Sequence, residues 1–174
     1  MNIYKFVILT SILIWSTWGH SDVNISIKGT LREPVCTVTG EDGNNIVNVF
    51  FGEAKIRDVG SGKVEKPIKL KVNCESMAPY NKVLKMKVTP TSNGVMNILG
   101  GNILKTSIDE LGIALIKGKD PVVLNQWLPV NEIDTNIGLP AGDIILTARL
   151  VTSNIKQLEA GEFSSSANLV ISYQ

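Results

Sequence analysis

The most constraining feature of this chain is an alternating apolar pattern that runs to its last residues. Ala167, Leu169, Ile171 and Tyr173 occupy every second position, and the sequence stops at Gln174. In a β-strand, residues two apart point to the same face, so these four side chains share one face. A sheet that stops there is expected to keep an open edge or groove, which another molecule would cover.

A second alternating stretch lies near the N-terminus and has no obvious partner strand close to it in the sequence. It contains Val23, Ile25, Ile27 and Leu31, with a glycine, Gly29, in the series. One hypothesis is a strand that completes another molecule, where Gly29 permits close approach because it has no Cβ. The other is an ordinary first strand of the chain's own sheet, with Gly29 as a turn residue.

The first 19 residues have the order of a secretory signal peptide. Lys5 precedes an apolar run from Phe6 to Trp15, and small or polar residues follow. The run is short for a bilayer span, so cleavage is expected after Gly19, with Ser21 as the alternative site. An uncleaved anchor helix is the competing interpretation. No other stretch is long enough to cross a membrane, so membrane insertion is not expected.

Composition and charge narrow the class of protein further. The 174 residues are 44% hydrophobic, which suffices for one domain with its own core. Lys and Arg number 17 against 16 Asp and Glu, giving a net charge of +1. Because nucleic acids and anionic membranes attract strongly basic surfaces, this balance predicts neither as a partner.

Two cysteines, Cys36 and Cys74, are the only ones in the sequence. In an exported protein such a pair predicts a disulfide, here between two strand-like segments. A metal site is not expected, because two thiols and the single histidine, His20, do not supply four ligands. No catalytic or cofactor-binding residues are predicted either, since His20 lies outside the folded body and a Ser-His-Asp or Cys-His site needs a histidine within it.

The rest of the chain reads as short strands separated by Gly, Asn, Asp and Pro. Strands or extended pieces are predicted at residues 36–38, 45–51, 68–74, 84–88, 112–116, 127–130 and 144–150. Helical spacing is weak, although residues 104–111 are compatible with one or two helical turns. This series predicts one all-β domain, an antiparallel sandwich of immunoglobulin type.

Taken in order, these features resemble subunits of chaperone-usher fimbriae, of the type 1 or P pilus kind. The similarity spans the whole chain: the signal peptide, the alternating tail, the entry Pro34-Val-Cys36, and the apolar run at residues 111–115. At the C-terminal end, Tyr173 is the penultimate residue and Gly161 the fourteenth from the end. No single feature is specific, but their order and placement together are.

The resemblance implies an incomplete immunoglobulin-like sandwich that lacks its last strand. It divides the chain into a signal peptide (1–19), an N-terminal donor-strand extension (20–33) and a pilin domain (34–174). It also implies export through the periplasm to the cell-surface fimbrium. A periplasmic chaperone would lend a strand to a groove along Ala167, Leu169, Ile171 and Tyr173, in the segment that begins near Gly161. At the outer-membrane usher, a neighbouring subunit's extension would replace that strand. This chain's own extension would fill the preceding subunit's groove, with Val23, Ile25, Ile27 and Leu31 as anchors.

Two classes of function compete at this point. The first is a structural fimbrial subunit; the low alanine content favours a minor or tip-adaptor subunit over a major or terminator pilin. The second is an adhesin that binds carbohydrate through loops carrying Trp127 and Tyr80. The chain is too short for a separate receptor domain ahead of a pilin domain, which favours the structural subunit. A secreted hydrolase is the weakest alternative.

Overall fold

The computed structural model describes residues 26–30, 35–98, 100–136 and 138–174. Within these ranges ten β-strands form two antiparallel sheets, and the helical content is one short 3-10 turn, Ile56–Asp58. Residues Glu33–Gln174 form one compact unit. The signal segment and its cleavage site lie outside the described residues, and so do the anchors Val23, Ile25 and Leu31. The described part of the tail, residues 26–30, forms no strand.

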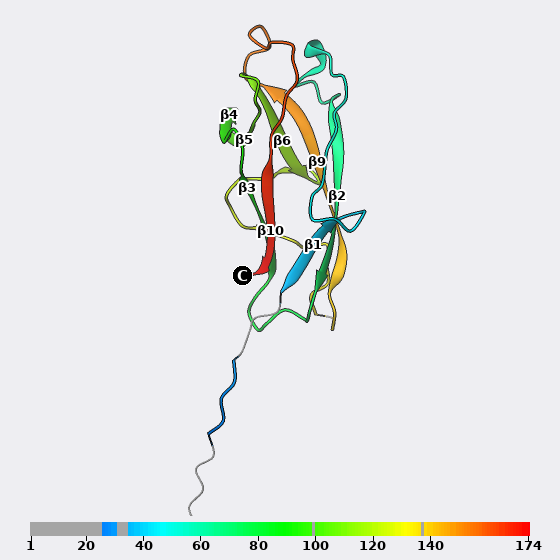
Figure 1. Ribbon diagram of the computed structural model, residues 1–174, viewed down its shortest axis with the longest axis vertical. Helices are drawn as coiled ribbons and strands as arrows, with labels where there is room; N and C mark the ends of the chain where they lie inside the picture. The colour runs from blue at the N-terminus through cyan, green and yellow to red at the C-terminus, as the bar shows by residue number, and fades with distance from the viewer. Residues whose placement is uncertain (1–25, 31–34, 99, 137) are drawn as a thin grey trace, which may run out of the picture. The chain divides into compact units, whose positions relative to one another are not determined.

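The larger sheet has the strand order β1-β2-β9-β6-β5-β4, and the two-residue strand β7 pairs with β6. Its strands are β1 (Cys36–Gly40), β2 (Glu65–Cys74), β4 (Val95–Ile98), β5 (Gly101–Lys105), β6 (Leu111–Lys117), β7 (Asp120–Pro121) and β9 (Ala141–Thr152). The smaller sheet has the order β10-β3-β8, from β10 (Ala167–Tyr173), β3 (Leu84–Pro90) and β8 (Leu128–Pro129). Figure 1 shows β10 lengthwise beside β1 of the larger sheet.

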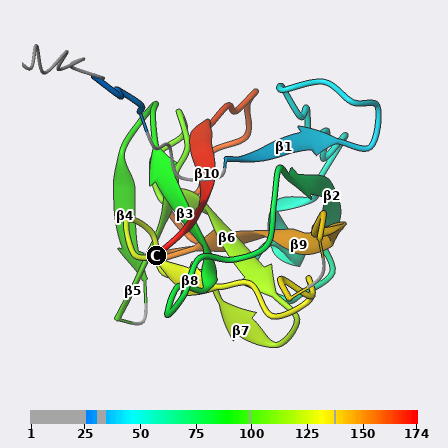
Figure 2. The same cartoon turned by 90° about the horizontal axis from the view of Figure 1, so that it is seen from below.

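Period-2 alternation explains how the two sheets pack. In β9 the side chains of Ile144, Leu146, Ala148 and Leu150 are buried, and those of the intervening residues are more exposed. The same alternation buries Leu84, Met86 and Val88 in β3. In the last part of β10 it buries Ile171 and Tyr173. Figure 2, turned by 90°, shows the larger sheet curving from β1 and β2 through β9 and β6 to β5 and β4. The apolar faces therefore enclose one core between the sheets, as in an immunoglobulin-like sandwich.

Two of the expected elements are wrong. Residues 45–51 alternate in sequence but form no strand, because none of their backbone groups pairs with another described strand. Residues 104–111 are not helical: they contain the end of β5, a turn and the start of β6. The turn is held by the buried hydroxyl of Thr106, which donates to the Leu111 carbonyl at 2.9 Å and accepts from the Ile108 N–H at 3.2 Å. The other predicted strands are present, with boundaries that differ by a few residues.

Candidate strand-docking groove

Strand β10 is hydrogen-bonded on one side only. It pairs with β3 in the register Ala167↔Pro90 to Tyr173↔Leu84, and it is an edge of the smaller sheet. Beyond its end, Val83 and Gln174 exchange two backbone hydrogen bonds of 3.1 and 2.9 Å. At the other end, the Thr91 N–H donates to the Ser166 carbonyl at 3.0 Å. These bonds fix which residue pairs of the ladder are hydrogen-bonded.

Hydrogen-bonded and non-hydrogen-bonded pairs alternate along an antiparallel ladder. Counting from the Val83–Gln174 pair, the residues of β10 in non-hydrogen-bonded pairs are Ala167, Leu169, Ile171 and Tyr173. Their backbone N–H and C=O groups therefore point away from β3, toward the open edge. Their side chains are also the ones that face the core. One set of four residues thus presents both the hydrogen-bonding groups and the apolar side chains that an added strand would meet.

Burial along this face is graded. Tyr173 and Ile171 are buried at 2% and 7% exposure, whereas Leu169 and Ala167 are only partly buried. On the opposite face Val170 is 48% exposed. The core-facing side of β10 is therefore closed near the C-terminus and incompletely covered toward its start.

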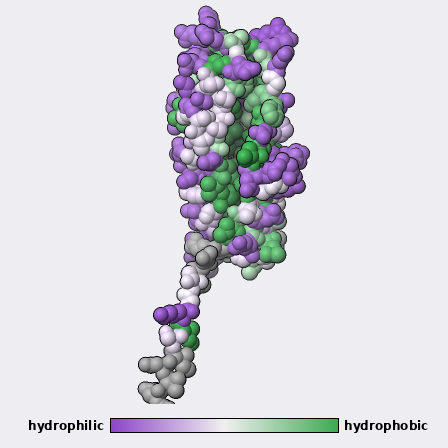
Figure 3. Space-filling view, viewed as in Figure 1, coloured by the Kyte–Doolittle hydropathy of each residue, from purple (hydrophilic) through white to green (hydrophobic). Residues whose placement is uncertain are grey.

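We take an extended segment, residues 45–51, as the second side of the candidate groove, because it packs against the same core and approaches the segment that leads into β10. Val49 and Phe51 are partly buried against the core, while Phe50 between them is exposed. Among the described residues, no backbone group of 45–51 has a backbone hydrogen-bond partner. The Phe51 ring lies 5.9 Å from that of Phe163, which precedes β10, at an interplanar angle of 52°. Figure 3 shows hydrophobic residues in a band along this face of the molecule. We call the surface between residues 45–51 and β10 the strand-docking groove.

Gly161 lies six residues before β10, in an exposed segment that forms no strand. A Cβ there would meet the Ile108 side chain at 3.5 Å, an ordinary contact, so this position does not require glycine in the structure. The following residues are held to the larger sheet: Ser107 and Ser164 are joined by backbone and side-chain bonds of 3.0 Å, and the Ser165 hydroxyl donates to the Lys105 carbonyl. The sequence did not predict the contact between Phe51 and Phe163 or these serine hydrogen bonds.

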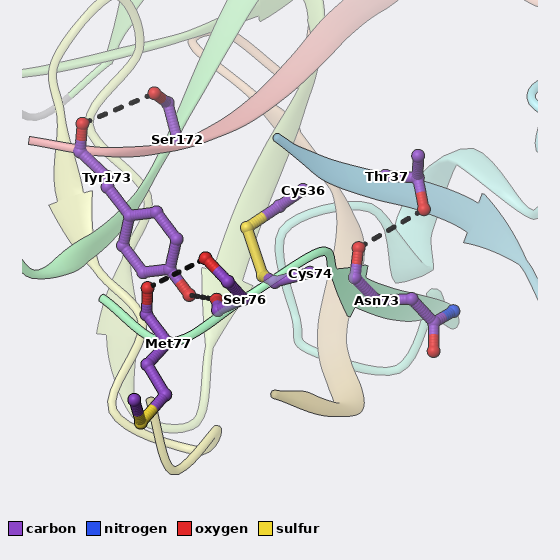
Figure 4. Close-up of a disulfide and its surroundings, with 8 residues drawn as sticks. All are labelled: Cys36, Thr37, Asn73, Cys74, Ser76, Met77, Ser172 and Tyr173. Carbon is purple, nitrogen blue, oxygen red and sulfur yellow. Dashed lines mark hydrogen bonds between the residues drawn. A yellow bond between two sulfur atoms is a disulfide. The ribbon is translucent and has the colours of Figure 1, made fainter. Parts of the chain in front are cut away.

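A disulfide and a tyrosine fix the closed end of the groove. Cys36 and Cys74 are bonded, joining β1 to β2 at directly opposite residues, as predicted. The Tyr173 hydroxyl donates to the Ser76 carbonyl at 3.0 Å, two residues beyond Cys74 (Figure 4). Burial raises the pKa of Tyr173, so the neutral hydroxyl is favoured. The last side chain of β10 is thereby attached to the segment that follows the disulfide.

The structure separates the two aromatic residues of the adhesin hypothesis. Trp127 is partly buried with the Lys87 ammonium 4.9 Å from its ring centroid, a cation–π contact on β3. Tyr80 is exposed in the connection between β2 and β3. They belong to different elements, and no hydrogen bond or ring contact joins them in the described residues.

Metal-ligating side chains are scattered over the described part of the chain. Within the described ranges, no three His, Cys, Asp or Glu side chains are grouped as metal ligands. In the same ranges no helix combines the length and apolar character needed to cross a bilayer.

Comparison with known proteins identifies the family. The family model for fimbrial proteins matches residues 25–174. This chain belongs to that family. It is 33% identical to the fimbrial protein PrsE of Escherichia coli over 95% of this chain and 94% of the relative. It is 29% identical to the fimbrial adapter PapF of the same organism, over 97% and 98%.

Solved structures agree on the fold. The P pilus adaptor subunit PapF superimposes with a TM-score of 0.52 at 25% identity, covering 80% of this chain and 96% of that one. The P pilus rod subunit PapA gives a TM-score of 0.54 at 17% identity over 80% and 99%. The protein is therefore a structural fimbrial subunit with the pilin fold, exported through the periplasm to the cell surface, where it assembles with neighbouring subunits.

Proposed function

We propose that this chain is a minor, adaptor-type fimbrial subunit that polymerises by strand addition. One observation on β10 supports the proposal. The residues whose backbone N–H and C=O groups point outward, without a backbone partner among the described residues, are the same residues whose side chains face the core. A strand placed between β10 and residues 45–51 would bond to both walls and cover Leu169 and Ala167. Backbone bonds would supply the ladder, and alternate side chains would supply the specificity.

An open groove needs a strand from another molecule, and membership of the fimbrial family indicates which molecules would supply it. A periplasmic chaperone would fill it first, and at the usher the extension of a neighbouring subunit would replace the chaperone strand. The adaptor role is supported by similarity to PapF over nearly the full length of both chains.

The extension of this chain, residues 20–33, would fill the groove of the preceding subunit. Val23, Ile25, Ile27 and Leu31 would be its buried anchors, with a gross gain of about 1.5–3 kcal/mol for each aliphatic side chain before ordering costs. Ile27 is 91% exposed, as expected for a side chain intended for another molecule. A Cβ added at Gly29 would meet no described atom within 4 Å, so a requirement for glycine there would come from the receiving subunit.

A rearranged chain tests the groove directly. Residues 20–33 are deleted and a copy is appended after Gln174 through a flexible linker, so that the copy can fold back antiparallel to β10. We expect a soluble monomer with a higher unfolding midpoint than the chain that lacks the copy. Ile27→Asp in the copy should abolish the gain, whereas Lys28→Asp, on the other face of the donor strand, should preserve it. Equal midpoints with and without the copy would contradict the proposal.

A further inference from the structure

One end of the folded body carries a group of exposed apolar side chains that the groove does not use. We call this end the docking pole. Tyr80 is 93% exposed, and four other side chains there are half or more exposed: Val35, Met77, Val83 and Leu139. Single exposed apolar residues are common on proteins, but a group at one site marks an interaction surface.

Backbone contacts place these residues at the same end. The Val35 carbonyl accepts from the Glu75 N–H at 3.0 Å, just before Met77. The Cys74 N–H donates to the Pro140 carbonyl at 2.8 Å, next to Leu139. The Ala78 N–H donates to the Thr135 carbonyl at 3.0 Å. Figure 2, which views the molecule from this end, shows the β2–β3 connection crossing it beside the segment that leads into β9.

The surface beside this connection is also hollowed. A hollow of about 430 Å³ is lined by Val83, Leu84 and residues 130–136. The double backbone bond between Val83 and Gln174 holds its rim to the C-terminal residue. The docking pole therefore combines projecting apolar side chains with a concave site, which suits contact with a second protein body.

The short link between the extension and the folded domain determines which molecule can reach this surface. The last proposed anchor of the extension, Leu31, is four residues before Val35. Four residues span at most about 14 Å when fully extended. When the extension lies in the groove of a receiving subunit, the docking pole is therefore held close to the surface of that subunit.

We propose that the docking pole is a second contact with the receiving subunit, made by Val35, Met77, Tyr80, Val83 and Leu139 when the extension is engaged. This proposal depends on the proposed function, because it takes the extension to be a donor strand. The tether raises the effective concentration of the second contact, so a small apolar surface suffices to orient one subunit on the next.

Hydroxyl-radical footprinting of a two-subunit complex tests the proposal. In the first sample, this chain has its own groove filled and its extension engaged in a receiving subunit. In the second, this chain's groove is filled in the same way, but the receiving subunit is filled with a synthetic peptide of residues 20–33, so the docking pole has no tethered partner. We expect oxidation of Met77 and Tyr80 to fall at least threefold in the first sample relative to the second. Oxidation of Phe50, which is outside the docking pole, should be similar in both.

A variant gives an independent readout. Met77→Ser with Tyr80→Ser should still form the complex but dissociate about tenfold faster in denaturant, since interface Tyr residues often contribute this much. The matched control is Ile145→Thr, an exposed apolar residue on the outer face of β9, which should leave the rate unchanged.

The outcomes separate the two proposals. Failure of the extension to form any complex would overturn the proposed function. A complex with unchanged footprints and equal dissociation rates would overturn only the docking pole. Protection of Met77 and Tyr80 by the chaperone alone, without protection in the two-subunit complex, would assign the surface to the chaperone and also overturn the proposal.

Discussion

Leu169 and Val170 provide a matched test of the strand-docking groove. They are adjacent in β10, but Leu169 faces the core from a partly covered position and Val170 is 48% exposed on the opposite face. If a donor strand fills the groove, it covers the remaining surface of Leu169 and leaves Val170 largely unchanged. Leu169→Ala should therefore weaken donor binding, and Val170→Ala should not.

The magnitude follows from burial. Full burial of a leucine side chain is worth about 1.5–3 kcal/mol, and most of Leu169 is already covered in the unfilled body. The part that depends on the donor is then at most about 1 kcal/mol, or about a fivefold loss of affinity. Ile171 is already buried at 7% exposure, so Ile171→Ala should lower the stability of the empty and filled bodies by similar amounts.

The assay is competition between a fluorescent peptide of residues 20–33 and its unlabelled form, on bodies that begin at residue 34 and are refolded with the peptide. Urea unfolding of the filled bodies measures stability separately from affinity. Two results would refute the reasoning. One is an unchanged affinity for Leu169→Ala, and the other is a larger loss for Val170→Ala than for Leu169→Ala.

Three other changes have defined outcomes. Replacing Cys36 and Cys74 together by Ser should lower the free energy of unfolding by about 4 kcal/mol, because the disulfide joins residues 38 positions apart in the sequence. Chemical denaturation under oxidising conditions measures this loss, and an unchanged unfolding midpoint would contradict it. Tyr173→Phe should cost about 1 kcal/mol at pH 7 by removing the bond to Ser76. Because the pKa of folded Tyr173 is raised above its ordinary value of 10.0, the wild type keeps the full contribution of the neutral hydroxyl below pH 10 and loses it as the pH rises further. The Phe variant should lack this alkaline loss in thermal melts, and identical pH profiles would argue against it. Deleting residues 20–32 should leave the unfolding transition of the body unchanged and abolish incorporation into fimbriae, measured by immunoblot of sheared fibres; wild-type incorporation would exclude the donor role.

Sequence patterns predicted most strands because alternation directly reports a strand with one buried face. Residues 84–88 and 144–150 are clear cases, and both lie inside longer strands that border the core. The same pattern failed at residues 45–51, where Val49 and Phe51 do pack against the core but no described strand forms backbone hydrogen bonds with the segment. Alternation detects which side chains are buried, whereas a strand also needs a hydrogen-bonding neighbour.

The error at residues 104–111 has a different cause. Apolar residues on either side of a tight turn fall at spacings that resemble a helical face. The structure shows instead that Thr106 bonds across the turn to Leu111 and Ile108, so that β5 and β6 pair as neighbours. Hydrogen bonds within the turn, from both the backbone N–H and the hydroxyl of Thr106 to the Leu111 carbonyl, hold this geometry, and the local spacing of hydrophobic residues does not predict them.

The amino-acid sequence by itself determined which side chains of the last strand share a face, which two cysteines bond, and which residues belong to an alternating extension. These properties depend on local spacing or on there being one pairing to choose. Only the tertiary structure decided that β10 is an edge of its sheet, that its free backbone groups belong to the core-facing residues, and that residues 45–51 have no backbone partner among the described residues. Hydrogen-bond partners in a sheet come from distant parts of the chain, so the side of β10 that remains open is set by how the whole sandwich assembles.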